Sequence, residues 1–523
     1  MHRRAFLATA GAATLAACTD PANDTAGAGT SEPHEPTAGT DTPARETAAS
    51  QVATSAAPPK PRWAPYLASA GAPPFENGVA SGDPGSDEVT LWTRVTGSSE
   101  PDVAVGWEVA TTDDFTDLVA AGSTTAHVDD NHSIRVRVTG LPPGPLFYRF
   151  GIEESSSPVG RTRTAATSHD APLRIALFSC QHYEEGWFVA HRAAVQDAPD
   201  LVVHVGDYIY GRWGVGTTVR SQPLARPRDL ADYRALYDTY RSDPDLQQLH
   251  AAAPFVAVWD DNEIRSDLAG TVPDPRDAPA KRAWWESQPT SLEPPAGDGT
   301  LPIHRAVDFG VARVWLLDGR QYRSPHVCED LEDIPGVDRC AAVDDEARTM
   351  LGAEQEAWLD NGVADDGAWD LVAQATVVAD LSVTLGGLTG INNDQWDGYA
   401  AARRRLLSSI GRTPRSVILS GDIHAAMVNV LTGPDGETIP EFVTPGATSR
   451  MDSGLAAGLR LAFGLRTAIR TFEPDVQGYV LLDVEPQQVR ATLRTVDPLD
   501  PASTPSTLGQ WVVTPDARRP QHI

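Results

Sequence analysis

LVVHVGDYIYG, residues 201–211, joins a short apolar run, suited to a buried strand, to a polar turn that carries Asp207. SVILSGDIHAA, residues 416–426, repeats this arrangement with Asp422 and His424. In open α/β sheets, ligands collect beyond the carboxyl ends of the strands. The recurrence therefore predicts a functional site that is built from the ends of separate strands.

Apolar segments alternate with amphipathic segments after residue 172. The apolar segments, which we interpret as strands, are LRIALF, LVVHV, PFVAVW, ARVWLL, LVAQATVVA and SVILS. The clearest amphipathic segments, typical of helices, are GWFVAHRAAVQDA and PRDLADYRALYDTYRSDPDLQQLHAAA. Continuous apolar strands with crossing helices indicate an α/β sheet that is covered on both faces. Such sheets are often mixed in strand direction.

Polar side chains that suit a metal centre follow several of these strands. They are Cys180, Asp207, the run Asp260-Asp261-Asn262-Glu263, Asp318, and the pair Asp422 and His424. A single acidic strand end is common, because Asp caps helices and starts turns. Several converging carboxylates would raise one another's pKa unless cations lay between them. The sequence therefore predicts bound metal.

The donor types restrict the chemistry of this metal centre. Carboxylate and amide oxygens suit a hard divalent ion such as Ca²⁺, whereas a phenolate together with a thiolate suits ferric iron. A carboxylate such as Asp207 can bridge two metals at a spacing of about 3.5–4 Å, as in two-metal hydrolytic sites. The sequence contains neither a G-x-S-x-G elbow nor a P-loop. We therefore expect hydrolysis by activated water rather than by a serine nucleophile.

Residues 75–163 have a different pattern, in which short strands are separated by turn residues. VTLWTRV alternates in polarity, and SIRVRVTGLPPGPLFYRFGI places two strands around a Gly-Pro turn. This spacing predicts a small all-β sandwich.

The first 18 residues, MHRRAFLATAGAATLAAC, resemble an export signal. The apolar run is shorter than the roughly 20 residues needed to span a bilayer, and Arg3-Arg4 before Phe6-Leu7 resemble a twin-arginine signal. The end of the run resembles a lipobox in which Cys18 would be lipidated; an ordinary cleavage site with a chance cysteine is the alternative. Residues 19–62 are rich in Thr, Ala and Pro, and we interpret them as a disordered tether.

Composition and cysteine content restrict the partners of the chain. It has 71 acidic and 42 basic residues, a formal net charge of −29, which opposes binding to nucleic acid through a basic face. The basic run Arg403-Arg404-Arg405 is expected to be a solvated helix face, so a lipid anchor at Cys18 is the one membrane contact that we expect. Cys328 and Cys340 bracket a loop in a chain with an export-like signal, and they predict a disulfide.

An ordered set of segments resembles the PhoD-type alkaline phosphatases and phosphodiesterases of the metallophosphoesterase superfamily. These segments are FENGVASGDPGSDEVTLWTRV, FSCQHYEEGWFVAHRAAVQDAPDLVVHVGDYIYG, VWDDNEIRSDLAG, LLDGRQYRS, MLGAEQEAWL, QWDGYAAARRRLL and ILSGDIHAAM. The resemblance implies an α/β (α+β) fold, in which helices flank a two-sheet sandwich and a small all-β sandwich precedes it. We accordingly expect the β-sandwich at residues 63–165, the catalytic domain at residues 171–495 and a C-terminal tail at residues 496–523.

The resemblance also implies a centre that contains Fe³⁺ and Ca²⁺. Cys180 and Tyr210 would bind iron, Asp207 would be shared between metals, and Asp422 and His424 would complete the centre. Tyr208, two residues before Tyr210, is expected to pack in the core.

The segment VWDDNEIRSDLAG departs from the family pattern. Relatives commonly have a histidine where this chain has Asn262, and asparagines where Ser266 and Asp267 stand. We expect Asp261 and Asn262 near the second metal, although an amide cannot donate a proton as an imidazole does. Arg320 in LDGRQYRS would either grip a phosphate oxygen during catalysis or form a structural salt bridge.

These features together predict an exported phosphoesterase that acts on small phosphate esters, in which a metal-held hydroxide attacks phosphorus in line. Three alternatives stay open: a phospholipase D-type phosphodiesterase, a catalytically quiet envelope protein that binds phosphate, and an unrelated metal hydrolase on a similar sheet. The catalytic residues in the preferred interpretation are Asp207, Asp422, His424 and Arg320.

Overall fold

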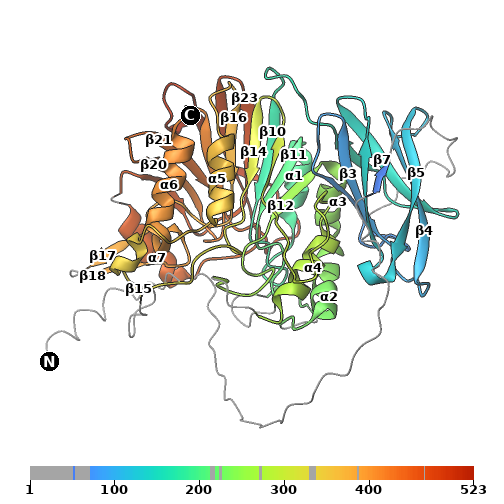
Figure 1. Ribbon diagram of the computed structural model, residues 1–523, viewed down its shortest axis with the longest axis horizontal. Helices are drawn as coiled ribbons and strands as arrows, with labels where there is room; N and C mark the ends of the chain where they lie inside the picture. The colour runs from blue at the N-terminus through green and yellow to red at the C-terminus, as the bar shows by residue number, and fades with distance from the viewer. Residues whose placement is uncertain are drawn as a thin grey trace, which may run out of the picture.

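The computed structural model describes residues 51–53, 71–211, 218–222, 226–269, 274–328, 337–385, 388–464 and 466–523. The expected export signal, Cys18 and most of the expected tether lie outside these residues. Figure 1 shows a β-sandwich, coloured blue to cyan, beside a larger body in which helices flank a pair of sheets. This mixed α/β architecture agrees with the fold expected from the sequence.

The β-sandwich is formed by strands from the first part of the described chain. They are β1 (Gln51–Ala53), β2 (Val79–Gly82), β3 (Glu88–Arg94), β4 (Asp102–Ala110), β5 (Leu118–His127), β6 (Ser133–Thr139), β7 (Pro145–Ile152), β8 (Ser155–Ser156) and β9 (Gly160–Arg163), with the 3₁₀ turn η1 (Val128–Asp130). One sheet has the order β1-β6-β3-β2, and the other has the order β5-β4-β7-β8 with β9 also on β7. Buried residues of both sheets, such as Leu91 and Val105, form the core between them. Strand β1 lies within the range expected to be a tether and pairs in parallel with β6.

The first sheet of the larger body has seven strands. In sheet order they are β12 (Phe255–Val258), β11 (Leu201–Val205), β10 (Leu173–Phe178), β23 (Gln477–Glu485), β24 (Gln488–Val496), β25 (Ser506–Val513) and β26 (Gln521–His522). Strands β10, β11 and β12 run in parallel, whereas β23 is antiparallel to β10. Residues 496–523, which the sequence sets apart as a tail, include β25 and β26.

The second sheet of the larger body also has seven strands of mixed direction. In sheet order they are β13 (Arg305–Asp308), β14 (Ala312–Leu316), β16 (Trp369–Ala373), β19 (Ser416–Ser420), β21 (Thr438–Val443), β20 (Ala426–Thr432) and β22 (Ile469–Glu473). The central strands β14, β16, β19 and β21 are parallel to their neighbours in this group. All residues of β16 and β19 are buried, which is why both strands are rich in apolar residues in the sequence.

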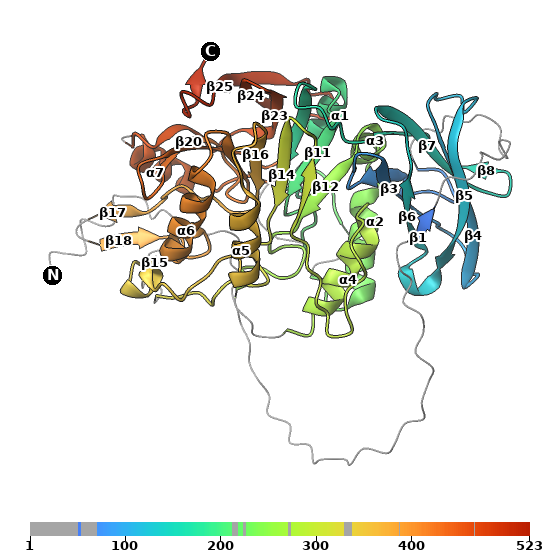
Figure 2. The same cartoon turned by 45° about the horizontal axis from the view of Figure 1, so that its top comes forward.

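The helices of the larger body cover the outer faces of the two sheets. They are α1 (Val189–Asp197), α2 (Leu230–Arg241), α3 (Pro244–Ala252), α4 (Asp277–Ser287), α5 (Ala353–Gly362), α6 (Ala400–Gly411) and α7 (Ser453–Phe463), with the 3₁₀ turns η2 (Ala341–Asp344) and η3 (Trp396–Tyr399). Figures 1 and 2 show α1 to α4 between the first sheet and the β-sandwich, and α5 and α6 beside the second sheet. The long amphipathic segment after residue 226 forms two helices, because Asp243 caps the N-terminus of α3 and Pro244 occupies its first turn.

The two sheets pack face to face around a shared core. Leu177 and Val203 of the first sheet belong to the same buried cluster as Leu371 and Leu419 of the second sheet. Strand residues with the opposite orientation, such as Ile418, pack against α5 and α6 instead. The sandwich of sheets therefore brings strand ends from both sheets to a common edge.

A small sheet and a disulfide lie at the side of the second sheet. The strands are β15 (Val337–Asp338), β18 (Leu388–Ile391) and β17 (Val383–Leu385), in this order. Cys328 and Cys340 form the predicted disulfide, with 5.5 Å between their Cα atoms. Cys180, the other cysteine that the structure describes, is free and buried.

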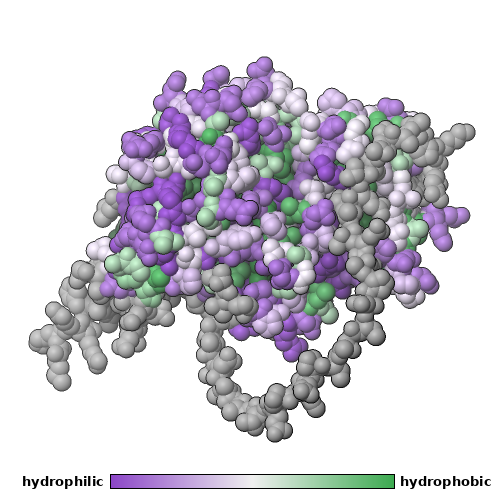
Figure 3. All heavy atoms as spheres, viewed as in Figure 1, coloured by the Kyte–Doolittle hydropathy of each residue, from purple (hydrophilic) through white to green (hydrophobic). Residues whose placement is uncertain are grey.

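The face of the molecule shown in Figure 3 is polar, and the basic run Arg403-Arg404-Arg405 of α6 is paired with acidic side chains. Figure 3 shows mainly hydrophilic residues with scattered apolar ones on the face in view. The three arginines of the basic run each pair with a carboxylate: Arg403 with Asp397, Arg404 with Glu346 and Arg405 with Glu356. None of the described helices is long and apolar enough to cross a membrane.

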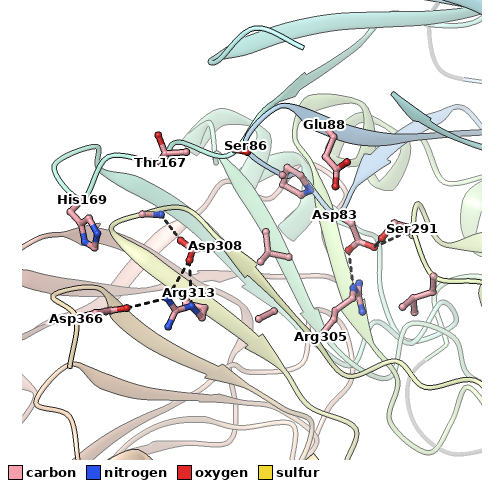
Figure 4. A pocket seen from close by; sticks show the side chains of 16 residues that line it. Asp83, Ser86, Glu88, Thr167, His169, Ser291, Arg305, Asp308, Arg313 and Asp366 are labelled. Carbon is pink, nitrogen blue, oxygen red and sulfur yellow. Dashed lines mark hydrogen bonds and ion pairs between the residues drawn. The ribbon is translucent and has the colours of Figure 1, made fainter. Parts of the chain in front are cut away.

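A cavity of about 580 Å³ lies at the junction of the β-sandwich and the larger body (Figure 4). Arg305 donates from Nε to Asp83 at 2.9 Å, and Arg313 pairs with Asp308 and Asp366. Since these arginines already have carboxylate partners, the cavity is lined by ion pairs at the contact between the β-sandwich and the larger body.

We predict that Gly82→Ala destabilises this junction. A Cβ atom at Gly82 would lie 2.1 Å from the carbonyl oxygen of Pro289 and 2.5 Å from that of Phe255, and such overpacking costs about 1–3 kcal/mol. Thermal unfolding should therefore occur at a lower temperature in the variant. Gly297→Ala is the control, because nothing lies within 4 Å of its Cβ position; equal unfolding temperatures for the two variants would contradict the prediction.

Candidate metal centre

Sharp turns at the strand ends aim the functional side chains at one place. Cys180 follows β10, Asp207 follows β11, and Asp422 and His424 follow β19. All four have positive φ angles, of 54°, 61°, 69° and 56° respectively. Non-glycine residues rarely adopt this left-handed region, and they do so mainly at functional sites, where surrounding structure holds them.

The loops of the two sheets also approach each other closely. A Cβ atom at Gly421, just before Asp422, would lie 2.6 Å from the Cβ of Ser179, just before Cys180. The thiol of Cys180 donates to the backbone oxygen of Asp422 with a separation of 3.7 Å. Glycine at position 421 therefore allows the two sheets to bring their polar strand ends together.

Two groups of possible metal ligands share Asp207. Ligand atoms of Cys180, Asp207 and His424 lie within 4.8 Å of one another, and so do carboxylate oxygens of Asp207, Asp260 and Asp261. We call Cys180, Asp207, Tyr210, Asp260, Asp261, Asn262, Asp422 and His424 the strand-end cluster. Thiol, carboxylate and imidazole donors are those that transition metals bind, and the oxygen-rich group around Asp207 fits a hard cation.

Tyr210 connects Asp207 to His424. Its hydroxyl donates to Oδ2 of Asp207 at 2.5 Å and lies 3.3 Å from Nε2 of His424. The other ring nitrogen of His424 is 3.2 Å from the backbone oxygen of Arg450. Tyr208 is buried in the core, and its hydroxyl lies 2.9 Å from a ring nitrogen of His250.

Asn262 contacts both carboxylates that the sequence places beside it. Its backbone N–H and its Nδ2 donate to Oδ1 of Asp207 at 3.3 and 3.1 Å, and Nδ2 also donates to Asp261 at 2.9 Å. The second oxygen of Asp261 accepts from the backbone N–H of Asp267 at 2.6 Å. Asp261 and Asn262 are thus adjacent to Asp207.

Asp422 lies beside these groups and is fixed by a glutamine. Its Oδ2 accepts a hydrogen bond from Nε2 of Gln395, and Oε1 of Gln395 accepts from the backbone N–H of Val377 at 2.7 Å. Neither three-residue group of possible ligands includes Asp422, although its charge acts on both Cys180 and Asp260.

Burial sets the protonation of the metal-free cluster. It raises the pKa of Asp207 well above its usual value, and the neighbouring charges of Asp261 and Asp260 raise that pKa further. Burial likewise raises the pKa of the Cys180 thiol and lowers the pKa of His424 to about 4. The imidazole is therefore neutral at pH 7, whereas the acidic groups need nearby positive charge before they ionise readily.

Arg320 supplies positive charge inside the protein. It is buried, its Nε donates to Asp260, and its Nη1 donates to Asp394 at 2.7 Å. Its Nη2 makes no hydrogen bond within the described residues. Two of its three nitrogens are thus engaged by carboxylates, as in the structural alternative that the sequence leaves open.

Sequence reasoning missed two supporting residues, Asp394 and Gln395, and named Glu263 only as part of the polar run after β12. Glu263, Asp394 and Gln395 are all buried and contact the residues of the strand-end cluster or Arg320. Glu263 belongs to the strand-end run DDNE, which was a usable signal. Asp394 and Gln395 precede a 3₁₀ turn and follow no core strand of the two sheets, so that strand-end reasoning does not reach them.

Comparisons with known proteins match almost the whole described chain. A profile of the PhoD-like phosphatase family matches residues 175–493, and one of the PhoD-like phosphatase N-terminal domain matches residues 61–166. Alkaline phosphatase D of Bacillus subtilis (strain 168) is 33% identical over 486 residues, which cover 85% of this chain and 81% of that protein. A solved structure described as that of PhoD superposes with a TM-score of 0.80 at 31% identity, covering 86% of this chain and 92% of the other.

We predict that the metal-free protein loses stability as the pH rises from about 7 to about 9. The pKa of Asp267 is raised to about 8, and that of Asp207 lies well above 3.8, chiefly through burial. An acid with a raised pKa in the folded state binds its proton more tightly there than in the unfolded chain. Its contribution to stability is complete below the unfolded pKa of about 4, falls as the pH rises, and is fully lost once the pH has passed the folded-state pKa, so that the interval from pH 7 to pH 9 contains the last part of the loss. Histidine effects do not enter, because the window lies above the unfolded histidine pKa of about 6.5.

Urea unfolding in EDTA at pH 7 and at pH 9 measures this loss. Added Ca²⁺ should reduce it, because a bound cation favours the ionised carboxylates. A metal-free protein that is more stable at pH 9 than at pH 7 would contradict the raised pKa values of Asp207 and Asp267.

Proposed function

Because this chain belongs to the PhoD-like phosphatase family and is a phosphoester hydrolase, we propose that the strand-end cluster holds the metals of its active site. The observation that carries this proposal is the convergence of Cys180, Asp207 and His424, whose ligand atoms lie within 4.8 Å of one another. These residues come from three strands of two sheets, and their turns have left-handed backbone conformations. A purely structural role would not require such an arrangement.

Two kinds of cation fit the donor set. Ferric iron would be held by Cys180 and Tyr210, with His424 and Asp422 completing its ligands. Ca²⁺ would be held by the oxygens of Asp261 and Asn262, and Asp207 would be shared between the two metals. When bound, these cations supply Lewis acidity, which lowers the pKa of a water and neutralises charge on the phosphoryl group.

The protein groups prepare this site in three ways. The neutral imidazole of His424 has a lone pair available at pH 7, because burial lowers its pKa. Asn262 holds Oδ1 of Asp207 through two N–H groups and thereby fixes the carboxylate that both metals would share. Gln395 fixes Asp422 through one hydrogen bond, from its Nε2 to Oδ2 of the carboxylate. The ligand carboxylates are thus oriented by hydrogen bonds before substrate arrives, which reduces the reorganisation needed in the transition state.

We propose that the main role of Arg320 is to compensate the negative charge of the neighbouring carboxylates. Its contacts with Asp260 and Asp394 offset part of their mutual repulsion, and only Nη2 is left to donate to a phosphate oxygen. A bidentate contact of Arg320 with a phosphate would require one of these two ion pairs to open. If Arg320 contacts the substrate, it therefore does so by donating a single hydrogen bond from Nη2 to a phosphate oxygen.

Hydrolysis of p-nitrophenyl phosphate and of its bis ester tests the proposal. Both activities should be lost after dialysis against EDTA and should return when metal is restored. The ratio of the two rates distinguishes monoesterase from diesterase, and a choline phospholipid as third substrate tests the phospholipase D-type alternative. Activity that is indifferent to chelator would remove the metal mechanism, and phosphate binding without turnover would favour the quiet binding protein.

Tyr210→Phe tests the iron assignment. Loss of the phenol should shift or abolish a visible absorption band of the as-purified protein and lower kcat/KM at least about 10–100-fold, the range seen for groups that support metal ligands. Tyr208→Phe is the matched control, because Tyr208 is a neighbouring buried phenol that bonds His250 instead. An active, colourless enzyme that contains zinc alone would refute iron and leave hydrolysis intact.

Export is the second part of the proposal and is supported by the first 18 residues. Arg3-Arg4 and Cys18 have the spacing of a twin-arginine signal followed by a lipobox. Cys18→Ser should move the protein from the membrane fraction to the soluble envelope or culture fraction. Equal membrane association of the variant and the wild type would contradict the lipid anchor.

A further inference from the structure

The carboxylate of Glu263 joins the two loops that carry Asp207 and Asp260. Its Oε1 accepts the backbone N–H of Tyr208 at 2.8 Å, and its Oε2 accepts those of Asp207 and Asp260, each at 3.1 Å. The side chain is fully buried. One side chain therefore ties the end of β11 to the end of β12.

The loop after β11 needs such a tie because its backbone is strained. Gly206 and Asp207 have φ angles of 101° and 61°, and a non-glycine residue in this region carries a conformational cost of about 1–3 kcal/mol. A Cβ atom at Gly206 would lie 2.5 Å from the Cβ of Asp260. The two loops therefore touch at the level of the backbone, and a displacement of one moves the other.

Electrostatics alone would disfavour a carboxylate at position 263. Its negative charge raises the pKa of Asp207 further, in a site that already contains several buried acids. Burial also raises the pKa of Glu263 itself to about 7, although its backbone hydrogen bonds act in the opposite direction. In return, the side chain accepts hydrogen bonds from three buried N–H groups, for which the described part of the chain shows no other acceptor.

We propose that Glu263 is a positioning residue for phosphoester hydrolysis, because it holds the backbone that places Asp207, Asp260 and the following Asp261-Asn262 pair. This inference rests on the proposed metal function of the strand-end cluster. It assigns to Glu263 no contact with metal or substrate: both carboxylate oxygens face backbone N–H groups. Its effect reaches the reaction through the geometry of the ligands.

Glu263→Gln removes this function with little change in volume. The carboxylate offers two acceptor oxygens, whereas the amide offers one oxygen and one NH₂ donor. In either orientation of the amide, the NH₂ group faces at least one of the three backbone N–H groups. One loop must therefore move away or leave its N–H without a partner.

The test compares the full-length wild type with Glu263→Gln at a temperature at which circular dichroism shows both to be folded. Ca²⁺ is titrated calorimetrically into metal-depleted protein, and the visible spectrum and the kinetics with p-nitrophenyl phosphate are recorded after metal is restored. We expect Ca²⁺ affinity and kcat to fall about 10–100-fold in the variant, the usual effect of removing a group that orients metal ligands. Unchanged Ca²⁺ affinity, spectrum and kcat, with a loss confined to thermal stability, would overturn the proposal.

Glu108→Gln is the matched control for the loss of a buried glutamate. Glu108 lies in β4 of the β-sandwich and pairs with Arg149 at 2.8 Å, both side chains being buried. The Glu108→Gln substitution should lower the unfolding temperature and leave Ca²⁺ affinity unchanged. If this control loses as much Ca²⁺ affinity as Glu263→Gln, general destabilisation explains the loss in both variants.

Glu263→Asp keeps the test decisive if Glu263→Gln does not fold. The aspartate keeps the negative charge, but its side chain is shorter by one methylene and cannot reach both loops. Ca²⁺ affinity should therefore fall, by a smaller factor than in Glu263→Gln. An unchanged affinity would overturn the proposal. A wild type that hydrolyses p-nitrophenyl phosphate without binding metal would overturn the proposed function itself, whereas a metal-dependent wild type with unaffected Glu263 variants would overturn the positioning role alone.

Discussion

Repulsion among buried carboxylates determines the protonation of the strand-end cluster and its need for positive charge. Asp207, Asp260 and Asp422 are all buried, and the pKa of each is raised by burial and by the charges of its neighbours. Charges interact more strongly in a protein interior than in water, because the effective dielectric constant is lower. Arg320 offsets part of this repulsion through Asp260 and Asp394. The remaining negative charge is what makes cations part of the proposed active site rather than an addition to it.

The two-sheet architecture explains how so many acids reach one place. Strands β10, β11 and β12 deliver Cys180, Asp207 and the Asp260 loop from the first sheet, and β19 delivers Asp422 and His424 from the second. Both sheets are held together by a large apolar core, whose burial supplies the main favourable free energy of folding. The hydrophobic core therefore stabilises a polar edge that would be unfavourable by itself, which is why strain and like charge can persist there.

The sequence predicts the ligands of the cluster better than the groups that support them. A buried strand that ends in Gly-Asp is a local pattern, so Asp207 and Asp422 can be located from neighbouring residues alone. Gln395 contacts Asp422 from 27 positions away, and Glu263 contacts Asp207 and Tyr208 from more than 50 positions away. Such partners depend on how the sheets pack. For the same reason, the sequence left the partner of Arg320 open between phosphate and carboxylate, and the pairing of β25 and β26 could not be read from residues 496–523.

Asn262 shows how an uncharged side chain fits this electrostatic setting. Its amide donates to Asp207 and to Asp261 and adds no charge of its own, so that it binds two acids without increasing their repulsion. An amide cannot, however, give a proton to a departing oxygen as an imidazole can. Within the proposed mechanism, the leaving oxygen must then be stabilised mainly by positive charge. The buried carboxylates require positive charge from the same cations. The crowding of acids at the two loops that Glu263 connects therefore links the stability of the cluster to its proposed chemistry.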